Sequence, residues 1–267
     1  GQQHADLEVR RHPPGGERDV NRHHAMVERD GVLDAVAVED PLEIRVAGAA
    51  VAVTMRTPGH DDELALGFLY GERLIDRAWE VGLSDDLAAN TVDVKGQLCR
   101  SVERRRFYTT SSCGVCGKGA IEEVTVEVAP LPPGPVMARE LLADLPNRLS
   151  QPAFELTGGV HATGLFSADG ELQLVREDVG RHNAMDKVVG HALRAGLLPL
   201  HGHALCVSGR LAFELVQKAA VAGAPILVGV GAPTSLAVQL AEQLGMTLCG
   251  FARQGRLNVY AGADRVA

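Results

Sequence analysis

The segment "HALCVSGRLAFELVQKAAVAGAPILVGVGAPTSLAVQLAEQLGMTLCGF" (203–251) decides the expected fold. Short apolar runs predict three strands, and the segments between them have the spacing of amphipathic helices. In chain order these elements are expected at 203–209, 210–222, 225–230, 233–244 and 246–251. Strands that alternate with helices predict a parallel or mixed sheet with helices packed on its faces. We therefore expect an α/β fold, with a mixed-sheet sandwich in the C-terminal half.

The chain before residue 203 predicts a different, smaller unit. Strand-like alternation, helical spacing and a cysteine-containing loop precede "LPPGPV" (131–136), a turn-rich stretch typical of a linker. We expect a flexible polar N-terminus at 1–30, a small α+β region at 31–136 and the α/β domain at 137–267. Within the last of these, 158–178 predicts a hairpin and 181–196 a helix.

Composition limits the classes of function. A net charge of −8 over 267 residues disfavours binding to nucleic acid, which requires a broad basic surface. The apolar runs are too short to cross a membrane, and no secretory signal is visible. Five cysteines, an odd number, favour a reducing cytoplasm.

Two cysteines stand three residues apart in "SSCGVCGKGA" (111–120). A structural zinc ion needs four ligands, and only Cys99 lies near Cys113 and Cys116, so we expect no metal. In a thioredoxin-like protein the cysteine pair lies at the start of a helix that follows a strand. Here strand-like sequence flanks the pair on both sides, which disfavours that interpretation.

The surroundings of the pair favour a reactive thiolate. Arginines 104–106 and Lys118 would lower a cysteine pKa, and the glycines leave the loop open. A structural zinc or redox module remains the alternative.

A second cluster lies in "EDVGRHNAMDK" (177–187). One interpretation is a polar pocket for an anionic or nucleotide ligand, with the two aspartates accepting from base N–H groups. The other is a solvated helix face with ordinary ion pairs. The candidate residues are Asp178, Arg181, His182, Asn183 and Asp186.

Two turns follow predicted strands, where ligand crevices of α/β sheets form. Ser208, Gly209 and Arg210 would begin a helix whose N–H groups bind an anion, although Ser208 equally fits a plain N-cap. Residues 231–235 are expected to form a second turn of this kind, between a predicted strand and a predicted helix. His161 lies between glycines and is a candidate neighbour of the ligand. The stretch "FARQGR" (251–256) either binds phosphate groups or forms a solvated turn.

Five segments together resemble the FdhD family of formate dehydrogenase accessory sulfurtransferases, over about residues 42–262. In chain order they are "SSCGVCGK", "TGGVHATGLF", "REDVGRHNAMDKVVG", "SGRLAFELVQKAA" and "FARQGRLNVYAG". No P-loop or G-x-G-x-x-G motif accompanies them, which disfavours a standard nucleotide hydrolase or dehydrogenase.

The resemblance implies a cytoplasmic sulfur carrier. A cysteine desulfurase would load Cys113 with a persulfide, with Cys116 accessory. The sulfur would pass to the molybdenum or tungsten of the bis(molybdopterin guanine dinucleotide) cofactor that formate dehydrogenase needs. The family's cofactor-binding stretch falls on Phe251, Ala252, Arg253, Gln254, Gly255 and Arg256.

The resemblance also implies a cytidine-deaminase-like fold and a homodimer that binds guanine nucleotides such as GDP. Three alternatives stay open beside the carrier. They are a guanine-nucleotide-binding protein with a structural zinc or redox pair, a nucleotide-handling enzyme, and a passive cofactor chaperone.

Overall fold

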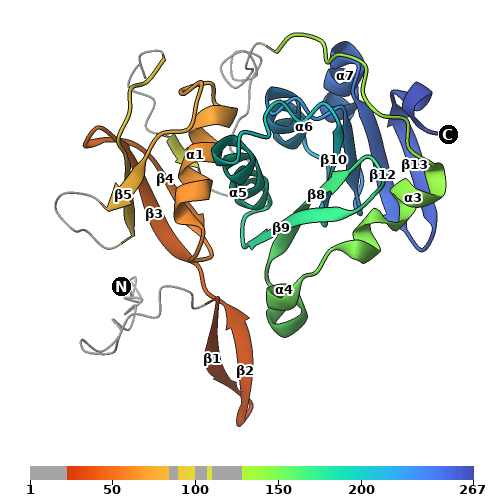
Figure 1. Cartoon of the computed structure of the whole chain (residues 1–267). Coiled ribbons are helices and arrows are strands. Elements are labelled where there is room, and N and C mark those ends of the chain that lie inside the picture. Colours follow the sequence, from red (N-terminus) through yellow and green to blue (C-terminus); the bar gives the residue numbers. More distant parts are fainter. Residues whose placement is uncertain (1–22, 84–89, 100–106, 110–127) are drawn as a thin grey trace, which may run out of the picture.

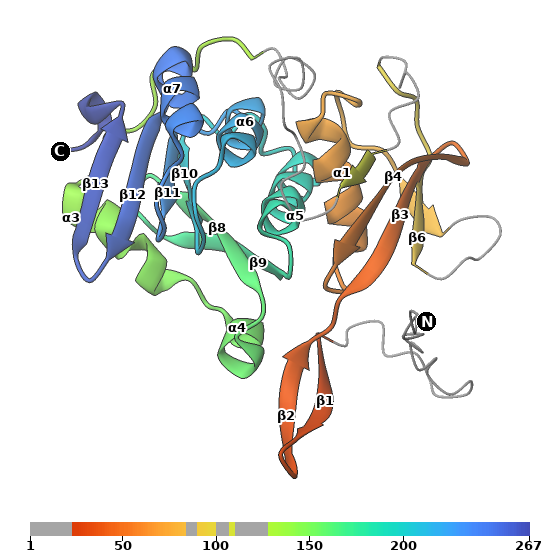
Figure 2. The same ribbon diagram turned by 180° about the vertical axis from the view of Figure 1, so that it is seen from behind.

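Two β-sheets flank a pair of helices, α1 (Asp61–Gly71) and α5 (Arg181–Arg194), which lie side by side at the centre of the molecule (Figures 1 and 2). The computed structural model describes residues 23–83, 90–99, 107–109 and 128–267. Both loop cysteines, Cys113 and Cys116, lie outside these ranges.

The larger sheet has the strand order β13-β12-β11-β10-β8-β9. Its strands are β8 (His161–Ser167), β9 (Leu172–Asp178), β10 (His203–Val207), β11 (Ile226–Gly229), β12 (Thr247–Arg253) and β13 (Arg256–Ala261). β10, β11 and β12 are parallel neighbours, and the other pairings are antiparallel. Helices α6 (Phe213–Val221) and α7 (Ser235–Leu244) alternate with the parallel strands. The predicted α/β fold with a mixed sheet is confirmed, and the likeness to cytidine deaminases stays a prediction.

Helices cover both faces of this sheet. On β10 and β11, Leu205 and Leu227 pack against α5, α6 and α7, whereas Cys206 and Val228 face the opposite core. The alternation follows the period of two in a strand. The opposite core is closed by α3 (Arg139–Asp144) and the 3-10 helix η1 (Leu145–Arg148). Burial raises the pKa of the Cys206 thiol, as expected for an inert core cysteine.

The smaller sheet has the order β5-β6-β3-β4-β7. Its strands are β3 (Asp40–Val46), β4 (Ala49–Arg56), β5 (Val81–Leu83), β6 (Thr91–Val94) and β7 (Phe107–Thr109). Leu64 and Leu69 of α1 pack on this sheet, and the other side of α1 contacts α5. We call this sheet with α1 the smaller lobe, and the remainder from residue 137 the larger lobe.

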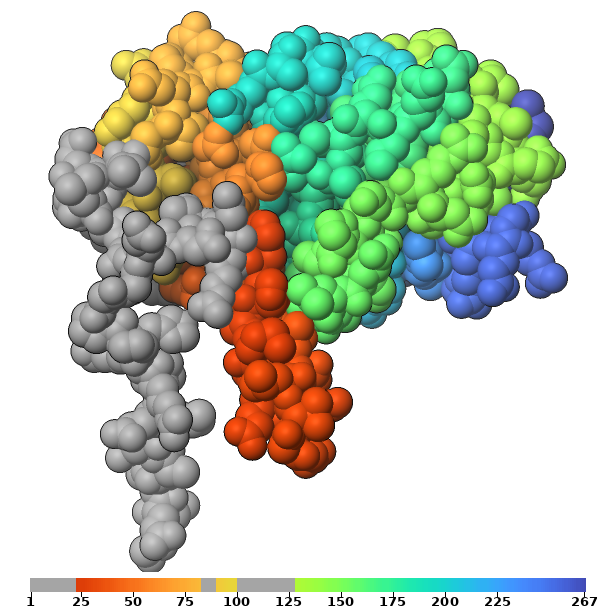
Figure 3. Space-filling model, turned by 60° about the horizontal axis from the view of Figure 1, so that its bottom comes forward, coloured from red at the N-terminus to blue at the C-terminus, as the bar shows by residue number. Residues whose placement is uncertain are grey.

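A hairpin of β1 (His24–Arg29) and β2 (Val32–Ala37) projects from the body (Figure 3). Its turn, Asp30-Gly31, has positive φ at both residues, 51° and 79°. Residues 24–30, counted above with the flexible N-terminus, therefore form a strand and a turn. An Asp-Gly pair between apolar alternations is the sequence signal of such a hairpin.

Two short helices complete the described chain, α4 (Pro152–Thr157) beside β2 and the 3-10 helix η2 (Ala263–Arg265). Within the described ranges no helix is both long and apolar enough to span a bilayer.

Candidate anion-binding site

A hollow of about 400 Å³ opens where β10 and β11 end and the antiparallel β8 begins. Its lining comprises His161, Arg181, Ser208, Gly209, Arg210, Val230, Gly231, Phe251 and Arg253. Seven of these were candidates from the sequence, and Gly231 belongs to the second predicted turn. Val230 was missed because an apolar residue at a strand end carries no chemical signal.

Backbone hydrogen bonds between the strand ends fix the rim of the hollow. Ala162 and Ser208 are joined twice, since the Ser208 N–H donates to the Ala162 carbonyl and Ser208 Oγ accepts from the Ala162 N–H, both at 2.9 Å. Gly231 N–H donates to the Gly209 carbonyl at 3.0 Å. A Cβ at Gly231 would lie 2.9 Å from the Arg210 Cα, so the close approach of the two turns requires glycine.

The first of these turns is not a helix N-terminus, contrary to the prediction. Helix α6 begins only at Phe213, and its N-cap position is occupied by Ala212 rather than Ser208. The chain stays extended past Arg210 because Leu211 forms a parallel bridge with Pro233. In the second turn Thr234 is an ordinary N-cap, with Oγ1 accepting from the Ala237 N–H at 3.3 Å.

The hollow is cationic. Arg181, Arg210 and Arg253 line it without any acidic side chain among the lining residues. Burial lowers the pKa of His161, and Arg181 and Arg210 lower it further, so this imidazole is neutral at neutral pH. The buried Nε of Arg181 has no hydrogen-bond partner among the described residues. Guanidinium forks suit phosphate and carboxylate groups, so the arrangement can bind an anion.

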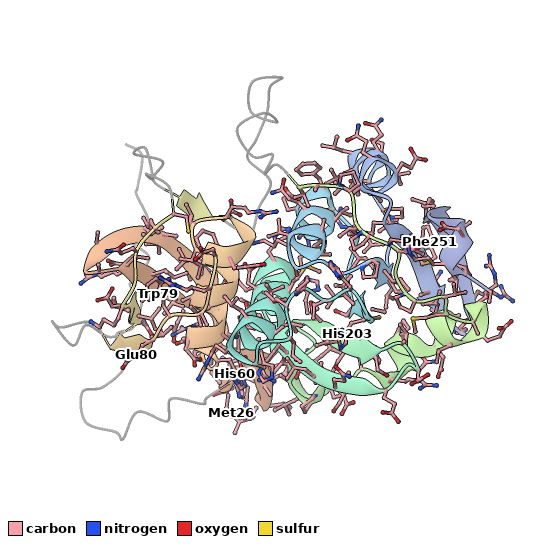
Figure 4. All side chains as sticks on the ribbon, turned by 45° about the horizontal axis from the view of Figure 1, so that its top comes forward. Met26, His60, Trp79, Glu80, His203 and Phe251 are labelled. Carbon is pink, nitrogen blue, oxygen red and sulfur yellow. The ribbon has the colours of Figure 1, made fainter. Side chains whose placement is uncertain are left out.

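The stretch "FARQGR" divides into three parts. Phe251 and Arg253, at the end of β12, line the hollow, whereas Ala252 is fully buried in the core beneath the sheet. Phe251 lies on the larger lobe, far from Trp79 of the smaller one (Figure 4). Gln254 and Gly255 form a two-residue hairpin turn with φ of 52° and 71°, and Arg256 starts β13. The last three residues therefore lie at a hairpin tip and not in the hollow.

The cluster at 177–187 divides as well. Only Arg181 lines the hollow. Asp178 is fully buried, and both of its carboxylate oxygens accept hydrogen bonds from protein groups, including Gly180 N–H at 2.8 Å. Asn183 is also buried, with its amide bonded to Thr54, Met55 and Asp178. These two side chains are not placed to read a nucleotide base.

Asp186 also lies in the interior, where both carboxylate oxygens accept from Lys218 Nζ at 2.8 and 3.0 Å. Burial raises the pKa of Asp186 to about 6, against the lowering effect of Lys218. Neither interpretation from the sequence holds for this residue. It is neither a ligand contact nor part of a solvated face.

His182 is not among the residues that line the hollow, and its Nε2 lies 3.8 Å from the Glu214 carboxylate. Burial, with Arg181 and Lys218, lowers its pKa to about 3. In the unfolded chain the same imidazole titrates near its ordinary value. The unfolded state therefore binds more protons than the folded state between about pH 3 and pH 6.5.

Stability should consequently fall as the pH drops through that window, by up to about 1.4 kcal/mol per pH unit from this group. His182→Gln is expected to flatten that slope in urea-unfolding titrations between pH 7 and pH 5. The exposed His201→Gln serves as the control. An unchanged slope in His182→Gln would show that His182 is not the group held neutral.

Among the described residues no three His, Cys, Asp or Glu side chains are grouped as a metal site. Cys113 and Cys116 lie outside those residues, so this says nothing about a zinc ion on the pair.

Together these features define a two-lobed α/β protein with an arginine-lined hollow at the carboxyl ends of its parallel strands. The sequence matches the FdhD/NarQ family over residues 37–267. The sulfur carrier protein FdhD of Nocardia farcinica is 50% identical over 246 residues, covering 87% of this chain and 88% of that protein. The protein of the same name from Streptomyces coelicolor is 50% identical over 262 residues, covering 90% and 93%.

A solved structure is similar as well. The crystal structure of a protein described as a formate dehydrogenase accessory protein, from Desulfotalea psychrophila, matches with a TM-score of 0.71. Identity is 27%, over 91% of this chain and 97% of that one. The chain belongs to the FdhD/NarQ family.

Proposed function

We propose that this chain is a sulfur carrier for formate dehydrogenase. It takes sulfur from a cysteine desulfurase as a persulfide on Cys113. It then passes the sulfur to the metal of bis(molybdopterin guanine dinucleotide), which is its substrate. The family, the names of its relatives and the order of the five motifs support the role. A cytoplasmic homodimer of cytidine-deaminase-like fold belongs to the same proposal.

The observation that carries the proposal is the hollow. A dinucleotide substrate presents phosphate groups, and Arg181, Arg210 and Arg253 offer three guanidinium forks with no competing carboxylate in the lining. The neutral His161 and the exposed ring of Phe251 add a hydrogen-bonding group and an apolar surface for the rest of the nucleotide. The residues present therefore fit the phosphate part of the proposed substrate.

A series of contacts links the last described residue before the cysteine loop to the start of α5. Thr109, the last described residue before the loop, is in parallel register with Thr54. Thr54 in turn donates to Asn183, two residues after Arg181. Cys113 follows Thr109 by four residues in the sequence.

Sulfur uptake needs a thiolate at Cys113. That thiolate attacks the outer sulfur of the desulfurase persulfide, whose sulfur–sulfur bond breaks. The desulfurase cysteine leaves as a thiolate, and the outer sulfur is now bonded to Cys113. Lowering the pKa of the receiving cysteine increases the fraction ready to react near neutral pH.

Intact-mass spectrometry after incubation with a cysteine desulfurase and cysteine tests this step. The wild type should gain one sulfur atom that reductant removes, and Cys113→Ala should gain none. Cys116→Ala is the matched control and should still accept sulfur. A zinc ion bound stoichiometrically without sulfur uptake would contradict the carrier role. Activation of formate dehydrogenase by Cys113→Ala would indicate a passive chaperone.

The hollow is tested separately with GDP as the probe. Arg210→Ala and Arg253→Ala should each weaken GDP binding about tenfold or more, because each removes a charge-assisted contact to phosphate. Arg148→Ala removes the same charge from an exposed arginine paired with Asp144 and should bind like the wild type. Titration calorimetry at fixed salt measures the affinities. Equal affinities in all three variants would remove the hollow from the proposal, and turnover of GDP would favour a nucleotide-handling enzyme.

A further inference from the structure

A buried hydrogen-bond network joins residues 54–57 of the smaller lobe to the start of α5. Asp178 lies at its centre and accepts from the Thr57 N–H at 3.1 Å and the Gly180 N–H at 2.8 Å. Lys187 Nζ lies 2.7 Å from the same carboxylate and donates to the Thr57 carbonyl at 2.9 Å. Thr57, Asp178 and Lys187 are each at most 1% exposed.

Further bonds extend the network on both sides. Thr57 Oγ1 accepts from the Val179 N–H at 3.0 Å. Thr54 Oγ1 donates to Asn183 Oδ1 at 3.2 Å, and Asn183 Nδ2 donates to the Met55 carbonyl at 2.7 Å. The three residues before Arg181 and the second residue after it are thus held by the other lobe or by Asp178.

We propose that this network is a positioning device that presents Arg181 to the anion in the hollow, and the proposal rests on the function argued above. Arg181 is the first residue of α5, and the first turn of a helix lacks the intrahelical bonds that hold its interior. Without an external anchor this turn would fray and the guanidinium would sample many positions. The network supplies the anchor from the smaller lobe.

The other two arginines of the hollow do not depend on this anchor. Arg210 precedes Leu211, which the larger lobe holds through the Leu211 N–H bond to Ala232 at 3.0 Å. Arg253 ends β12 within its own hairpin. This difference between the three arginines can be tested. A change in the network should act through Arg181 and leave the contributions of Arg210 and Arg253 intact.

The network makes one cation of the hollow depend on the contact between the lobes. Thr57 and Met55 anchor residues on both sides of Arg181. Arg181 is one of the three arginines that line the hollow.

Thr57 provides the test because it anchors the network without lining the hollow. Thr57→Val keeps the shape of the side chain but leaves the partly buried Val179 N–H without its acceptor, and it should weaken GDP binding about tenfold. Thr57→Ser restores the hydroxyl and should recover most of the affinity. In an Arg181→Ala background the difference between the two variants should vanish, whereas an Arg210→Ala background should preserve it. An effect of equal size in both backgrounds, or none in the wild type, would overturn the proposal.

A second measurement needs no ligand. Hydrogen exchange at the buried Nε–H of Arg181, assigned by its loss in Arg181→Lys, should become about tenfold faster in Thr57→Val and recover in Thr57→Ser. Unchanged exchange in Thr57→Val would overturn the positioning role whether or not GDP binds. Failure of the wild type to bind GDP, with exchange altered as expected, would instead count against the proposed function alone.

Discussion

Gly190→Ala is expected to lower the free energy of unfolding by about 3 kcal/mol or more, because α1 and α5 touch through their backbones. A Cβ at Gly190 would lie 1.8 Å from the carbonyl oxygen of Glu63. The contact is reciprocal, since a Cβ at Gly67 would lie 1.8 Å from the carbonyl oxygen of Asp186. Neither obstacle is a movable side-chain end, so the two helices must separate.

Urea unfolding measures the effect, and Gly202→Ala is its matched control. A Cβ at Gly202 would meet nothing within 4 Å, and its φ is not positive. Its cost should stay within about 0.5 kcal/mol. Alanine favours a helix over glycine by about 1 kcal/mol, so any loss in Gly190→Ala comes from the contact and exceeds that gain. A Gly190→Ala variant as stable as the wild type would contradict the close packing of α1 on α5.

The sequence predicted the elements of the larger sheet better than the way its helices meet the smaller lobe. β10, α6, β11, α7 and β12 follow from periodicity, since each element has its own apolar pattern. The α1–α5 contact has only an indirect signal. Gly67 and Gly190 interrupt otherwise good helical segments, which indicates close packing but does not name the partner helix.

The candidate site was predictable to the same degree. Arg181, Arg210 and Arg253 stand at ends of predicted elements, and the topology of the sheet brings those ends together. Asp178 and Asn183 were candidates either for ligand contacts or for a solvated face, and the structure buries both side chains instead. Helical spacing shows which residues share a face, but only the docking of the smaller lobe shows that this face is covered.

Lys218→Met is the second change with a large expected effect, a loss of about 3–5 kcal/mol in the free energy of unfolding. Lys218 lies on α6, and its Nζ donates to the buried carboxylate of Asp186 on α5. The carboxylate of Glu72, which follows α1, lies 3.8 Å from the same Nζ. Burial alone would lower the pKa of Lys218, but Asp186 and Glu72 raise it above its ordinary value, so the lysine is charged. Removing it leaves the buried carboxyl group of Asp186 without its partner, so Asp186 must either stay ionised in the interior or take up a proton.

The pH dependence distinguishes this charge effect from loss of packing. Without Lys218 the folded-state pKa of Asp186 lies far above its unfolded value, so the folded state binds a proton that the unfolded state releases. In the wild type the pKa of Asp186 is about 6, so the deficit of Lys218→Met should grow as the pH rises from about 6 to 8, by up to about 1.4 kcal/mol per unit until the folded-state pKa of the variant is passed. Lys218→Met combined with Asp186→Leu removes both charges and should recover most of the stability, with no such slope. A deficit that is independent of pH and persists in the double variant would show that Lys218 stabilises the junction by its aliphatic stem rather than by its charge.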